Sequence, residues 1–556
     1  MTGTASPSMI GVDVGGTFTD VVAVRDGEIL TTKVTTDYVE SHRAVIRGAE
    51  ELGADVQVFN HASTHGLNAI ITRNLPKIGF LTTEGHRDML DMARAHRPPE
   101  ANTDPRWRRS FGDVSGPVVP RYLRRGIRER IDADGSIVVG LDEEQAREQI
   151  RVLKDCAVEG VAICLLNSYV DPTHERRLRD LVAEELGADI ACSISYDVSP
   201  LAREYPRAST TVVDVLMKEI YGPYARKLEK GLADAGFRGE LNFADCAATL
   251  APIDVALERP ARIVFSGPAA GTVACARLGD MIDEPNLLCV DIGGTSADIS
   301  VVTNGKPFVN TTFELEHDLI VNTLSNEIVS VGAGGGSIVW VNRAGEIQVG
   351  PKSAGSDPGP ACYGTGGTQP TTTDTFVMIG ILDPHRFAAG RSTLDHDLAQ
   401  HAFEQLATGA TLAERVRFAY KMAINNVAEG VLDVVVKDGI DPREYSLVSF
   451  GAAGSMMLPQ LLDVMHSQKR DRSAVPGSVL GARAGQRRPG ALGQPDVVHR
   501  ARAGRRADRR RAVQGHGGAH AGRTRRGRRR GDLRADLRRH AHRPGLGDAV
   551  RRGALR

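Results

Sequence analysis

Alternating apolar and polar positions mark two segments of the chain as β-meanders. Residues 8–29, SMIGVDVGGTFTDVVAVRDGEI, contain two apolar runs around a glycine turn and a second turn at Asp26-Gly27. Residues 287–307, LLCVDIGGTSADISVVTNGKP, repeat this order, with the second turn at Asn304-Gly305. Strand, tight turn, strand, tight turn, strand is a meander, whereas Rossmann and P-loop sites pass from a strand directly into a helix. The pattern therefore predicts one supersecondary unit that occurs twice.

The two segments agree in register as well as in pattern. Asp13 and Asp291 each end an apolar run, and a second acid, Asp20 or Asp298, follows seven positions later. Glycines let backbone N–H groups approach an anion closely, and a strand-end carboxylate can hold Mg²⁺ or orient a nucleophile. A single turn of this kind is common in proteins and does not by itself indicate phosphate binding. Two copies in the same register, 278 positions apart, indicate two hairpins that together grip the phosphates of one nucleotide.

Strand-like and helical runs alternate between and after the meanders. Residues 158–170 read as a buried strand, and residues 171–186 as a helix with Asp171 as N-cap and Pro172 at its first position. The other segments with a clear pattern are a strand at 77–82 and helices near 38–52, 203–232 and 412–438. Strands that alternate with helices predict an α/β architecture.

The composition is that of a soluble globular protein. The chain has 556 residues with 41% apolar content, enough for roughly two to four domains. Its longest apolar run, residues 161–166, is too short to cross a bilayer, and no export signal is visible. Seven cysteines are spread singly without a CxxC pair. This pattern favours reduced thiols, a cytoplasmic location and no membrane association.

Charge is unevenly distributed although the formal net charge is zero. Residues 471–556 contain 24 Arg and 6 Asp but no Lys or Glu, whereas residues 1–470 contain 45 basic and 63 acidic side chains. The same C-terminal stretch lacks aromatic residues, Ile, Met, Cys and Asn. It has too little apolar surface to offset its chain entropy, so we expect an Arg-rich tail at residues 467–556 that is disordered or aberrant.

Two interpretations of this tail remain open. In the first, it binds polyanions non-specifically through counterion release, without specific nucleic-acid recognition. In the second, it results from a reading-frame shift near residues 467–472, because GC-rich codons read out of frame yield Arg, Ala and Gly without Lys or Asn. A frame shift would leave a truncated, non-catalytic nucleotide-binding remnant. The nucleotide sequence distinguishes the two interpretations.

The paired Asp-Gly-Gly-Thr hairpins resemble the phosphate 1 and phosphate 2 motifs of the actin, Hsp70 and sugar-kinase superfamily. FGAAGS at residues 450–455 resembles the adenosine motif of that superfamily. The resemblance implies two ribonuclease-H-like halves around a nucleotide cleft that binds ATP and Mg²⁺.

A longer set of motifs narrows the resemblance. GVDVGGTFTDVV, TTEGHRDML, SGPAAGTV, GAGGGSI, GPKSAGSDPGPACYGTGGTQPTTTD and KDGIDPREYSLVSFGAAG resemble the hydantoinase A/5-oxoprolinase family over residues 9–465. This resemblance implies one domain at residues 1–200, a second at 201–466 and a B-type partner subunit. It also implies ATP-dependent hydrolysis of a cyclic amide such as 5-oxoproline or a hydantoin. ATP-dependent carboxylation of a ketone, as in acetone and acetophenone carboxylases, is the alternative within the same family.

The hairpin chemistry and the resemblance together define the candidate site. We expect the catalytic residues to be Asp13, Asp20, Asp291, Asp298 and His61, with Asp13 and Asp291 as metal ligands. We expect the nucleotide-binding residues to be Gly15, Gly16, Thr17, Thr19, Gly293, Gly294, Thr295, Gly334, Gly335, Gly336, Gly451 and Gly454.

Several segments depart from the family pattern or allow a purely structural role. HASTHGLNA at residues 61–69 differs from the usual family motif, which indicates a divergent acyl-substrate pocket. His61 is either a general acid/base or a structural hydrogen-bonding residue. SGPAAG at residues 266–271 is either a helix start or a nucleotide contact, and Asp374 is either a helix cap or a catalytic acid.

Overall fold

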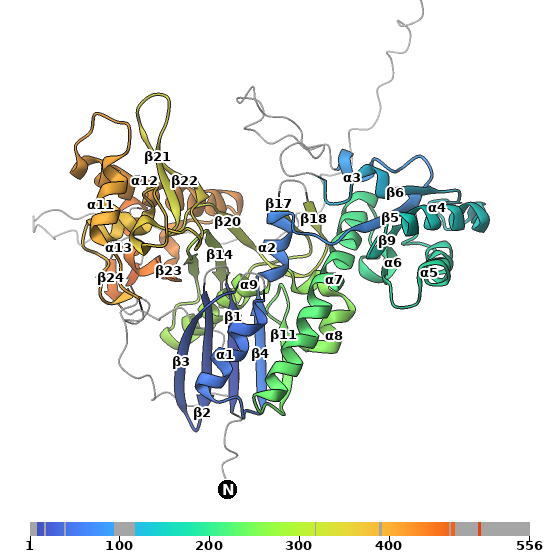
Figure 1. Ribbon diagram of the computed structural model, residues 1–556, viewed down its shortest axis with the longest axis horizontal. Helices are drawn as coiled ribbons and strands as arrows, with labels where there is room; N and C mark the ends of the chain where they lie inside the picture. The colour runs from blue at the N-terminus through green and yellow to red at the C-terminus, as the bar shows by residue number, and fades with distance from the viewer. Residues whose placement is uncertain are drawn as a thin grey trace, which may run out of the picture. The chain divides into compact units, whose positions relative to one another are not determined.

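Two mixed β-sheets, one from each half of the chain, carry the two meanders (Figure 1). They are seen in a computed structural model that describes residues 8–15, 18–37, 40–93, 117–316, 319–387, 392–465, 469–472 and 499–501. Among these residues, no helix combines the length and apolar character that crossing a membrane requires.

The first sheet is built around the N-terminal meander. Its strands are β1 (Met9–Val14), β2 (Phe18–Arg25), β3 (Glu28–Thr35), β4 (Val58–Ser63), β11 (Glu240–Ala244) and β12 (Leu250–Pro252), in the order β12-β11-β4-β1-β2-β3. β1, β2 and β3 are antiparallel, while β4 is parallel to β1 and β11 is parallel to β4. The sheet therefore includes strands that follow residue 200, where the resemblance divides the chain.

Three helices flank this sheet: α1 (His42–Leu52), α2 (His65–Thr72) and α7 (Glu204–Asp234). The buried face of α1 consists of the small or branched residues Ala44, Val45, Gly48 and Ala49. At Gly48 an added Cβ would lie 2.5 Å from a methyl carbon of Val21, so the glycine lets α1 pack directly on β2. α1 and α7 start and end close to segments that the sequence pattern predicts as helices, whereas the pattern does not predict α2.

A four-stranded parallel sheet is inserted between α2 and α7. Its strands are β5 (Ile78–Thr83), β6 (Arg124–Ile127), β9 (Gly160–Cys164) and β10 (Ala191–Ile194), in the order β10-β9-β5-β6. The associated elements are α3 (Met89–Met92), the hairpin β7 (Arg130–Ile131) and β8 (Ile137–Val139), α4 (Glu143–Asp155), α5 (Thr173–Leu186) and α6 (Ser195–Val198). β9 is buried at every position, as expected for a central parallel strand with an almost continuous apolar sequence.

The start of α5 differs from the prediction by one residue. The helix begins at Thr173 with Pro172 as its cap, not with Asp171 as N-cap and Pro172 inside. Asp171 still stabilises this end, because its Oδ1 accepts hydrogen bonds from the Thr173 N–H at 2.9 Å and the Thr173 hydroxyl at 2.6 Å.

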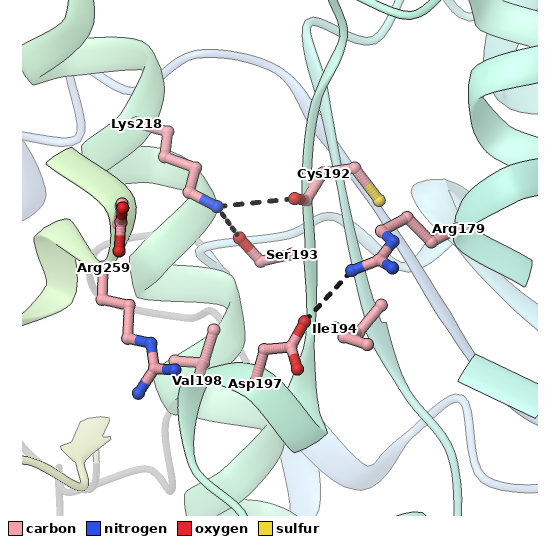
Figure 2. A pocket seen from close by; sticks show the side chains of 9 residues that line it. Arg179, Cys192, Ser193, Ile194, Asp197, Val198, Lys218 and Arg259 are labelled. Carbon is pink, nitrogen blue, oxygen red and sulfur yellow. Dashed lines mark hydrogen bonds and ion pairs between the residues drawn. The ribbon is translucent and has the colours of Figure 1, made fainter. Parts of the chain in front are cut away.

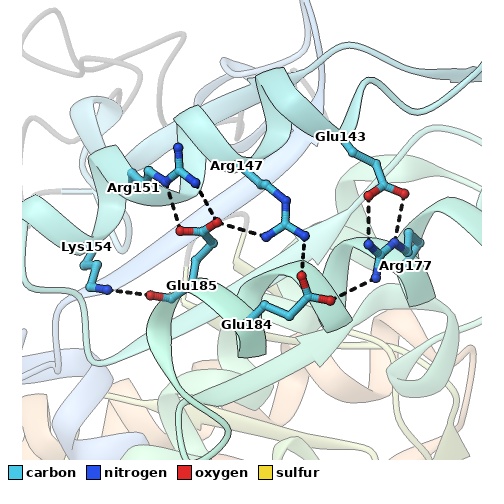
Figure 3. Close-up of polar contacts among 7 residues, drawn as sticks. All are labelled: Glu143, Arg147, Arg151, Lys154, Arg177, Glu184 and Glu185. Atoms are coloured by element: carbon cyan, nitrogen blue, oxygen red, sulfur yellow. Dashed lines mark hydrogen bonds and ion pairs between the residues drawn. The ribbon is translucent and has the colours of Figure 1, made fainter.

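Ion pairs join α4 to α5 along their exposed sides (Figure 3). Arg147 and Arg151 each lie 2.9 Å from Glu185, and Arg177 lies 2.7 Å from Glu143. Exposed ion pairs of this kind contribute little to stability, because water and salt screen the charges.

The second sheet repeats the meander with a divided third strand. β13 (Leu287–Ile292) and β14 (Ala297–Thr303) are antiparallel, and β23 (Ser446–Phe450) is parallel to β13. Both the short β15 (Lys306–Pro307) and β20 (Ile328–Val331) pair with β14, β20 lying beside residues 297–300. The remaining strands of this half form small hairpins: β16 (Val309–Asn310) with β19 (Ser325–Asn326), β17 (Phe313–Glu316) with β18 (Leu319–Val321), and β21 (Ser337–Val341) with β22 (Ile347–Ser353).

Helices again cover this second sheet. They are α9 (Ser266–Ile282), α10 (Thr372–Met378), α11 (His396–Glu404), α12 (Leu412–Lys437) and α13 (Gly454–Val464), while α8 (Ile253–Glu258) and the 3₁₀ helix η3 (Pro260–Ile263) precede α9. One hydrophobic core extends from Ile10 to Phe265 and also includes Leu319 and Val321. A second core joins residues between Leu288 and Met465. The α/β prediction with two meander-based halves is confirmed.

The Arg-rich tail lies mostly outside the described residues. Its described parts, β24 (Lys469–Arg472) and β25 (His499–Ala501), pair with each other in antiparallel fashion. The predictions made for the tail therefore stay predictions.

Candidate functional site

Each glycine hairpin places its two acids directly opposite each other. Asp13 pairs with Asp20 across β1 and β2, and Asp291 pairs with Asp298 across β13 and β14. Side chains of directly paired residues project from the same face of a sheet, about 4.5–5.5 Å apart at Cβ. The seven-residue spacing read from the sequence is thus the spacing of a cross-strand carboxylate pair.

The turns that join these strands have the same hydrogen bond in both copies. The Gly15 N–H donates to the Phe18 carbonyl at 3.1 Å, and the Gly293 N–H donates to the Ser296 carbonyl at 2.9 Å. Gly294 and Thr295 are exposed at the tip of the second turn. Gly16 and Thr17, their counterparts in the first copy, lie outside the described residues.

Lys33 is a site residue that the sequence analysis missed. The turn at Asp26 and Gly27 has positive φ at both positions, +49° and +84°, as a type I′ hairpin requires. It fixes the register of β2 and β3 so that Asp20 faces Lys33, and the two side chains form an ion pair at 2.7 Å. Counting outward from the predicted turn would have identified this partner.

The second hairpin has no lysine in this place. Because β20 pairs with that part of β14, Ser330 faces Asp298 and its hydroxyl donates a hydrogen bond to the carboxylate. The two copies therefore share their acids but differ in what holds the second acid: a cation in the first, a neutral hydroxyl in the second.

Electrostatics couple the two acid pairs to each other. The pKa of Asp13 is raised to about 7, mainly by burial and further by the negative charges of Asp20 and Asp298. Burial and the charges of Asp298, Asp13 and Asp20 raise the pKa of Asp291 well above its usual range. Burial raises the pKa of Asp298 to about 6, and it raises the pKa of Asp20 against the opposing charge of Lys33. Since each hairpin perturbs the acids of the other, the four carboxylates share one electrostatic environment.

One oxygen in this group has no partner. Oδ1 of Asp13 is buried and accepts no hydrogen bond within the described structure. An added Cβ at Gly267, in the first turn of α9, would lie only 2.9 Å from this oxygen. α9 begins at Ser266, whose hydroxyl accepts a hydrogen bond from the Ser63 N–H at 3.0 Å. The SGPAAG segment is therefore a helix start that lies against the acid of the first hairpin.

Gly451 has a similar relation to the acid of the second hairpin. It follows β23, whose Phe450 pairs with Asp291, and its backbone φ is +80°. An added Cβ would lie 2.2 Å from Asp291 Oδ1 and 2.6 Å from the Ile292 carbonyl oxygen. Gly454 lies further along, buried at the start of α13. Each strand-end acid is thus covered by a glycine from another element.

The triple glycine at residues 334–336 packs against the second turn with its backbone. The N–H groups of Gly335 and Gly336 donate to the carbonyls of Gly293 and Gly294 at 3.0 and 2.6 Å, and the Gly334 N–H donates to the Ser337 hydroxyl at 2.9 Å. An added Cβ at Gly334 would lie 2.7 Å from the Gly294 backbone. These amides support the turn from behind, and their predicted nucleotide contact stays a prediction.

Thr19 has a similar internal role. Its buried hydroxyl lies 2.9 Å from the Thr36 hydroxyl, which donates to the Gly15 carbonyl at 3.0 Å. This pair links β3 to the first glycine turn, so in the described structure Thr19 positions the turn.

His61 lies apart from the four aspartates. It pairs with Val12, whereas Asp13 pairs with Ala62, so His61 projects from the opposite face of the sheet. Its Nε2 lies 2.6 Å from the Tyr224 hydroxyl, its ring stacks on Phe243 at 4.6 Å, and its Nδ1 has no partner among the described residues. Burial lowers the pKa of His61 to about 3, which keeps the imidazole neutral. Its predicted catalytic role stays a prediction.

Asp374 is a helix cap. Its carboxylate accepts hydrogen bonds from the Thr371 N–H at 2.8 Å and the Cys362 N–H at 2.7 Å, and it forms a capping box with Thr371 at the start of α10. Of the two roles open to it from the sequence, the structure supports capping.

The described residues contain no group of three or more His, Cys, Asp or Glu side chains arranged to hold a metal ion. The candidate metal ligands remain Asp13 and Asp291, one from each hairpin. Mg²⁺ commonly uses only one or two protein carboxylates and completes its shell with water and phosphate oxygens.

Sequence comparison identifies the family. The hydantoinase/oxoprolinase N-terminal region matches residues 9–186, and the hydantoinase/oxoprolinase domain matches residues 207–484. The chain belongs to the hydantoinase/oxoprolinase family. The resemblance drawn from the sequence motifs is confirmed.

Relatives in this family include proteins with different named activities. The chain is 32% identical to an uncharacterized protein of Methanocaldococcus jannaschii, covering 82% of this chain and 69% of the relative. It is 33% identical to the acetophenone carboxylase gamma subunit of Aromatoleum aromaticum, and the match covers 80% of this chain and 63% of that subunit. It is 31% identical to the caprolactamase subunit alpha of Pseudomonas jessenii, covering 83% and 67%. The chain thus spans about two thirds of the length of these relatives.

Two solved structures of hydantoinase/oxoprolinase relatives share the fold. A nucleotide-free acetone carboxylase matches with a TM-score of 0.73 at 26% identity, covering 83% of this chain and 67% of that one. An ATP-dependent caprolactamase from Pseudomonas jessenii matches with a TM-score of 0.70 at 29% identity, covering 83% and 68%. Both relatives are described as ATP-dependent enzymes.

Replacing Gly451 by Ala should lower the free energy of unfolding by about 2–4 kcal/mol. The new Cβ would collide with Asp291 and a backbone carbonyl, and the positive φ adds strain. Gly439→Ala is the matched control, because its φ is +65° but nothing lies within 4 Å of the added Cβ. It should cost about 1 kcal/mol. Urea unfolding measures both, and equal losses would contradict the close packing of Gly451 on Asp291.

Replacing Asp13 by Asn should change how stability depends on pH. The pKa of Asp13 rises from 3.8 to about 7 on folding, so the folded state holds a proton that the unfolded state releases. Stability from this group is therefore complete below about pH 4 and is lost as the pH rises through 7. Asp13→Asn should exceed the wild type in unfolding midpoint at pH 8, by roughly 2–5 °C, but not at pH 4.

The exposed turn variant Asp26→Asn is the control for this pH series, because Asn304 occupies the equivalent position in the second hairpin. It should follow the wild type at both pH values. Identical pH profiles for Asp13→Asn and the wild type would show that Asp13 is not perturbed.

Proposed function

We propose that this chain is the ATP-binding, A-type subunit of an enzyme that couples ATP cleavage to the hydrolysis of a cyclic amide. One observation carries the proposal: two hairpins of the same design present four carboxylates, and burial together with the charges of the other acids raises the pKa of Asp13 and Asp291. Such a group favours a bound cation and the phosphates that accompany it. Membership in a family with ATP-dependent relatives supports the same conclusion.

The residues present fit a nucleotide phosphate chain with Mg²⁺. Asp13 Oδ1 is buried without a partner, and the surrounding acids supply the hard oxygen ligands that Mg²⁺ prefers. A Cβ at position 267 would lie only 2.9 Å from this oxygen, so the glycine keeps the carboxylate clear of a side chain. Mg²⁺ held by Asp13 and Asp291 would neutralise part of the negative charge on the phosphates.

We assign roles to the hairpin residues on this basis. The turns at Gly15, Gly16, Thr17 and at Gly293, Gly294, Thr295 contact phosphate oxygens through backbone N–H groups and hydroxyls at their tips. The N–H groups of Gly15 and Gly293 close the turns, and these glycines let the phosphates approach closely. Asp13 and Asp291 hold the metal, while Asp20 and Asp298 orient them and the attacking oxygen. Lys33 adds a positive charge beside the first turn. Catalysis is then mainly electrostatic positioning of the transferred phosphoryl group.

The substrate class rests on the family. We propose a lactam of the 5-oxoproline or hydantoin type, whose carbonyl is activated at the expense of ATP before water opens the ring. Relatives named caprolactamase and 5-oxoprolinase support an amide substrate, while relatives named acetone and acetophenone carboxylase define the ketone alternative. Their names as subunits support a partner chain for this protein, which we propose to be a B-type hydantoinase subunit.

Asp13→Asn and Asp291→Asn should each reduce MgATP turnover by about 100-fold or more while the fold is retained. The measurement is ADP release by the full chain with its co-purified partner, in the presence of a lactam panel. Circular dichroism and the unfolding midpoint report the fold. Asp26→Asn is the control and should keep wild-type turnover.

The two substrate classes separate in the same assay. Stimulation of ADP release by 5-oxoproline or hydantoin supports the amide hydrolase. Stimulation only by a ketone together with bicarbonate favours the carboxylase. Full turnover in both aspartate variants would refute the nucleotide site.

A further inference from the structure

A second charged cavity lies away from the hairpins, where the inserted parallel sheet meets α7 and α8 (Figure 2). Its volume is about 230 Å³. Side chains from five parts of the chain line it: Arg179 of α5, Cys192, Ser193 and Ile194 of β10, Asp197 and Val198 of α6, Lys218 of α7, and Glu258 and Arg259 at the end of α8.

A buried carboxylate lies behind two of the lining residues, Ser193 and Lys218. Asp214 is fully buried and accepts hydrogen bonds from the Ser193 hydroxyl at 2.7 Å and the Ala261 N–H at 3.2 Å. The Lys218 ammonium lies 3.5 Å from Asp214 and donates to the Ser193 hydroxyl at 2.9 Å. Lys218 is therefore held at the cavity by neighbours on β10 and α7, and it is not a freely moving surface lysine.

Two charged side chains of the cavity have no polar partner within the described structure. They are Glu258 and Arg259, which are adjacent in the sequence and both line the cavity. Neither side chain forms an ion pair or a hydrogen bond with another described residue. In contrast, Arg179 lies 3.1 Å from Asp197. In Figure 2, Lys218 and Arg259 approach from one side of the cavity and Arg179 from the other.

The charges of the lining determine the ligand class. The lining contains three cationic side chains, Arg179, Lys218 and Arg259, and two anionic ones, Asp197 and Glu258, and the buried Asp214 lies behind Lys218. A simple cation would be repelled by the three bases, and a simple dianion would meet the two acids. A ligand that carries both charges can satisfy the bases with carboxylate oxygens and the acids with an ammonium group.

The size of the cavity limits the ligand further. A volume of 230 Å³ corresponds to roughly eight water molecules at the liquid value of about 30 Å³ each. We infer that this cavity binds a small zwitterionic amino acid with an additional carboxylate, whose carboxylates lie on Arg259 and Lys218 and whose ammonium lies on Asp197 and Glu258. This site is separate from the four-aspartate site and does not depend on the function proposed for it.

Calorimetric titration of the full chain with L-aspartate tests this inference, with succinate as the matched ligand that lacks only the amino group. Aspartate should bind at one saturable site, and succinate should bind more weakly. Arg259→Gln should weaken aspartate binding by about tenfold or more, because it removes one charged partner of a carboxylate. Arg259→Lys should restore part of the affinity, since it returns the positive charge.

Arg277→Gln is the control variant, because Arg277 is an exposed arginine of α9 that does not line the cavity. It should bind aspartate like the wild type. Arg259 makes no side-chain contact that folding would lose, and an unchanged unfolding midpoint of Arg259→Gln verifies this. Absence of saturable aspartate binding, equal binding of succinate, or equal affinity in Arg259→Gln and wild type would each overturn the inference.

Discussion

Repulsion among four carboxylates is the constraint around which the two halves of this protein are arranged. Two like charges about 5.5 Å apart repel by about 3 kcal/mol at an effective dielectric constant near 20, several times the thermal energy. In the folded chain, Asp13 nevertheless lies opposite Asp20, and Asp291 lies opposite Asp298, in neighbouring strands. Oδ1 of Asp13 is also buried without a hydrogen-bond partner among the described residues. Burial first, and the charges of the neighbouring acids second, raise the pKa of Asp13 and Asp291, which shows the cost of this arrangement. A bound divalent cation would relieve the repulsion, which is why we connect the arrangement with function.

The surrounding elements keep the acids in place by close backbone approach. Gly267 of α9 lies against Asp13 and Gly451 lies against Asp291, and at both positions a side chain would collide with the carboxylate. The glycines at 334–336 support the second turn from behind through backbone hydrogen bonds. The two hairpins share this design but differ in detail. Lys33 forms an ion pair with the second acid of the first hairpin, whereas Ser330 donates a hydrogen bond to its counterpart in the second.

Local patterns in the sequence were sufficient for the hairpins and for the long helices. The alternation of apolar residues and the turn at Asp26-Gly27 determine the register of the strands, and this register places Lys33 opposite Asp20. Contacts between distant segments are not encoded in such local patterns. Three contacts depend on which strands become neighbours. They are the stacking of His61 on Phe243, the closeness of α9 to Asp13, and the backbone hydrogen bonds of Gly335 and Gly336 to the second turn. For the same reason, the sequence predicted nucleotide contact for Gly334, Gly335 and Gly336 but not their backbone packing against the second turn.

The most direct test of the central claim is a crystal structure of the protein with Mg²⁺ and a non-hydrolysable ATP analogue. The account predicts that the triphosphate lies between the two glycine turns, with Mg²⁺ bound by Asp13, Asp291 or both. A triphosphate that contacts only one hairpin, or that binds elsewhere while the four aspartates face solvent, would contradict it.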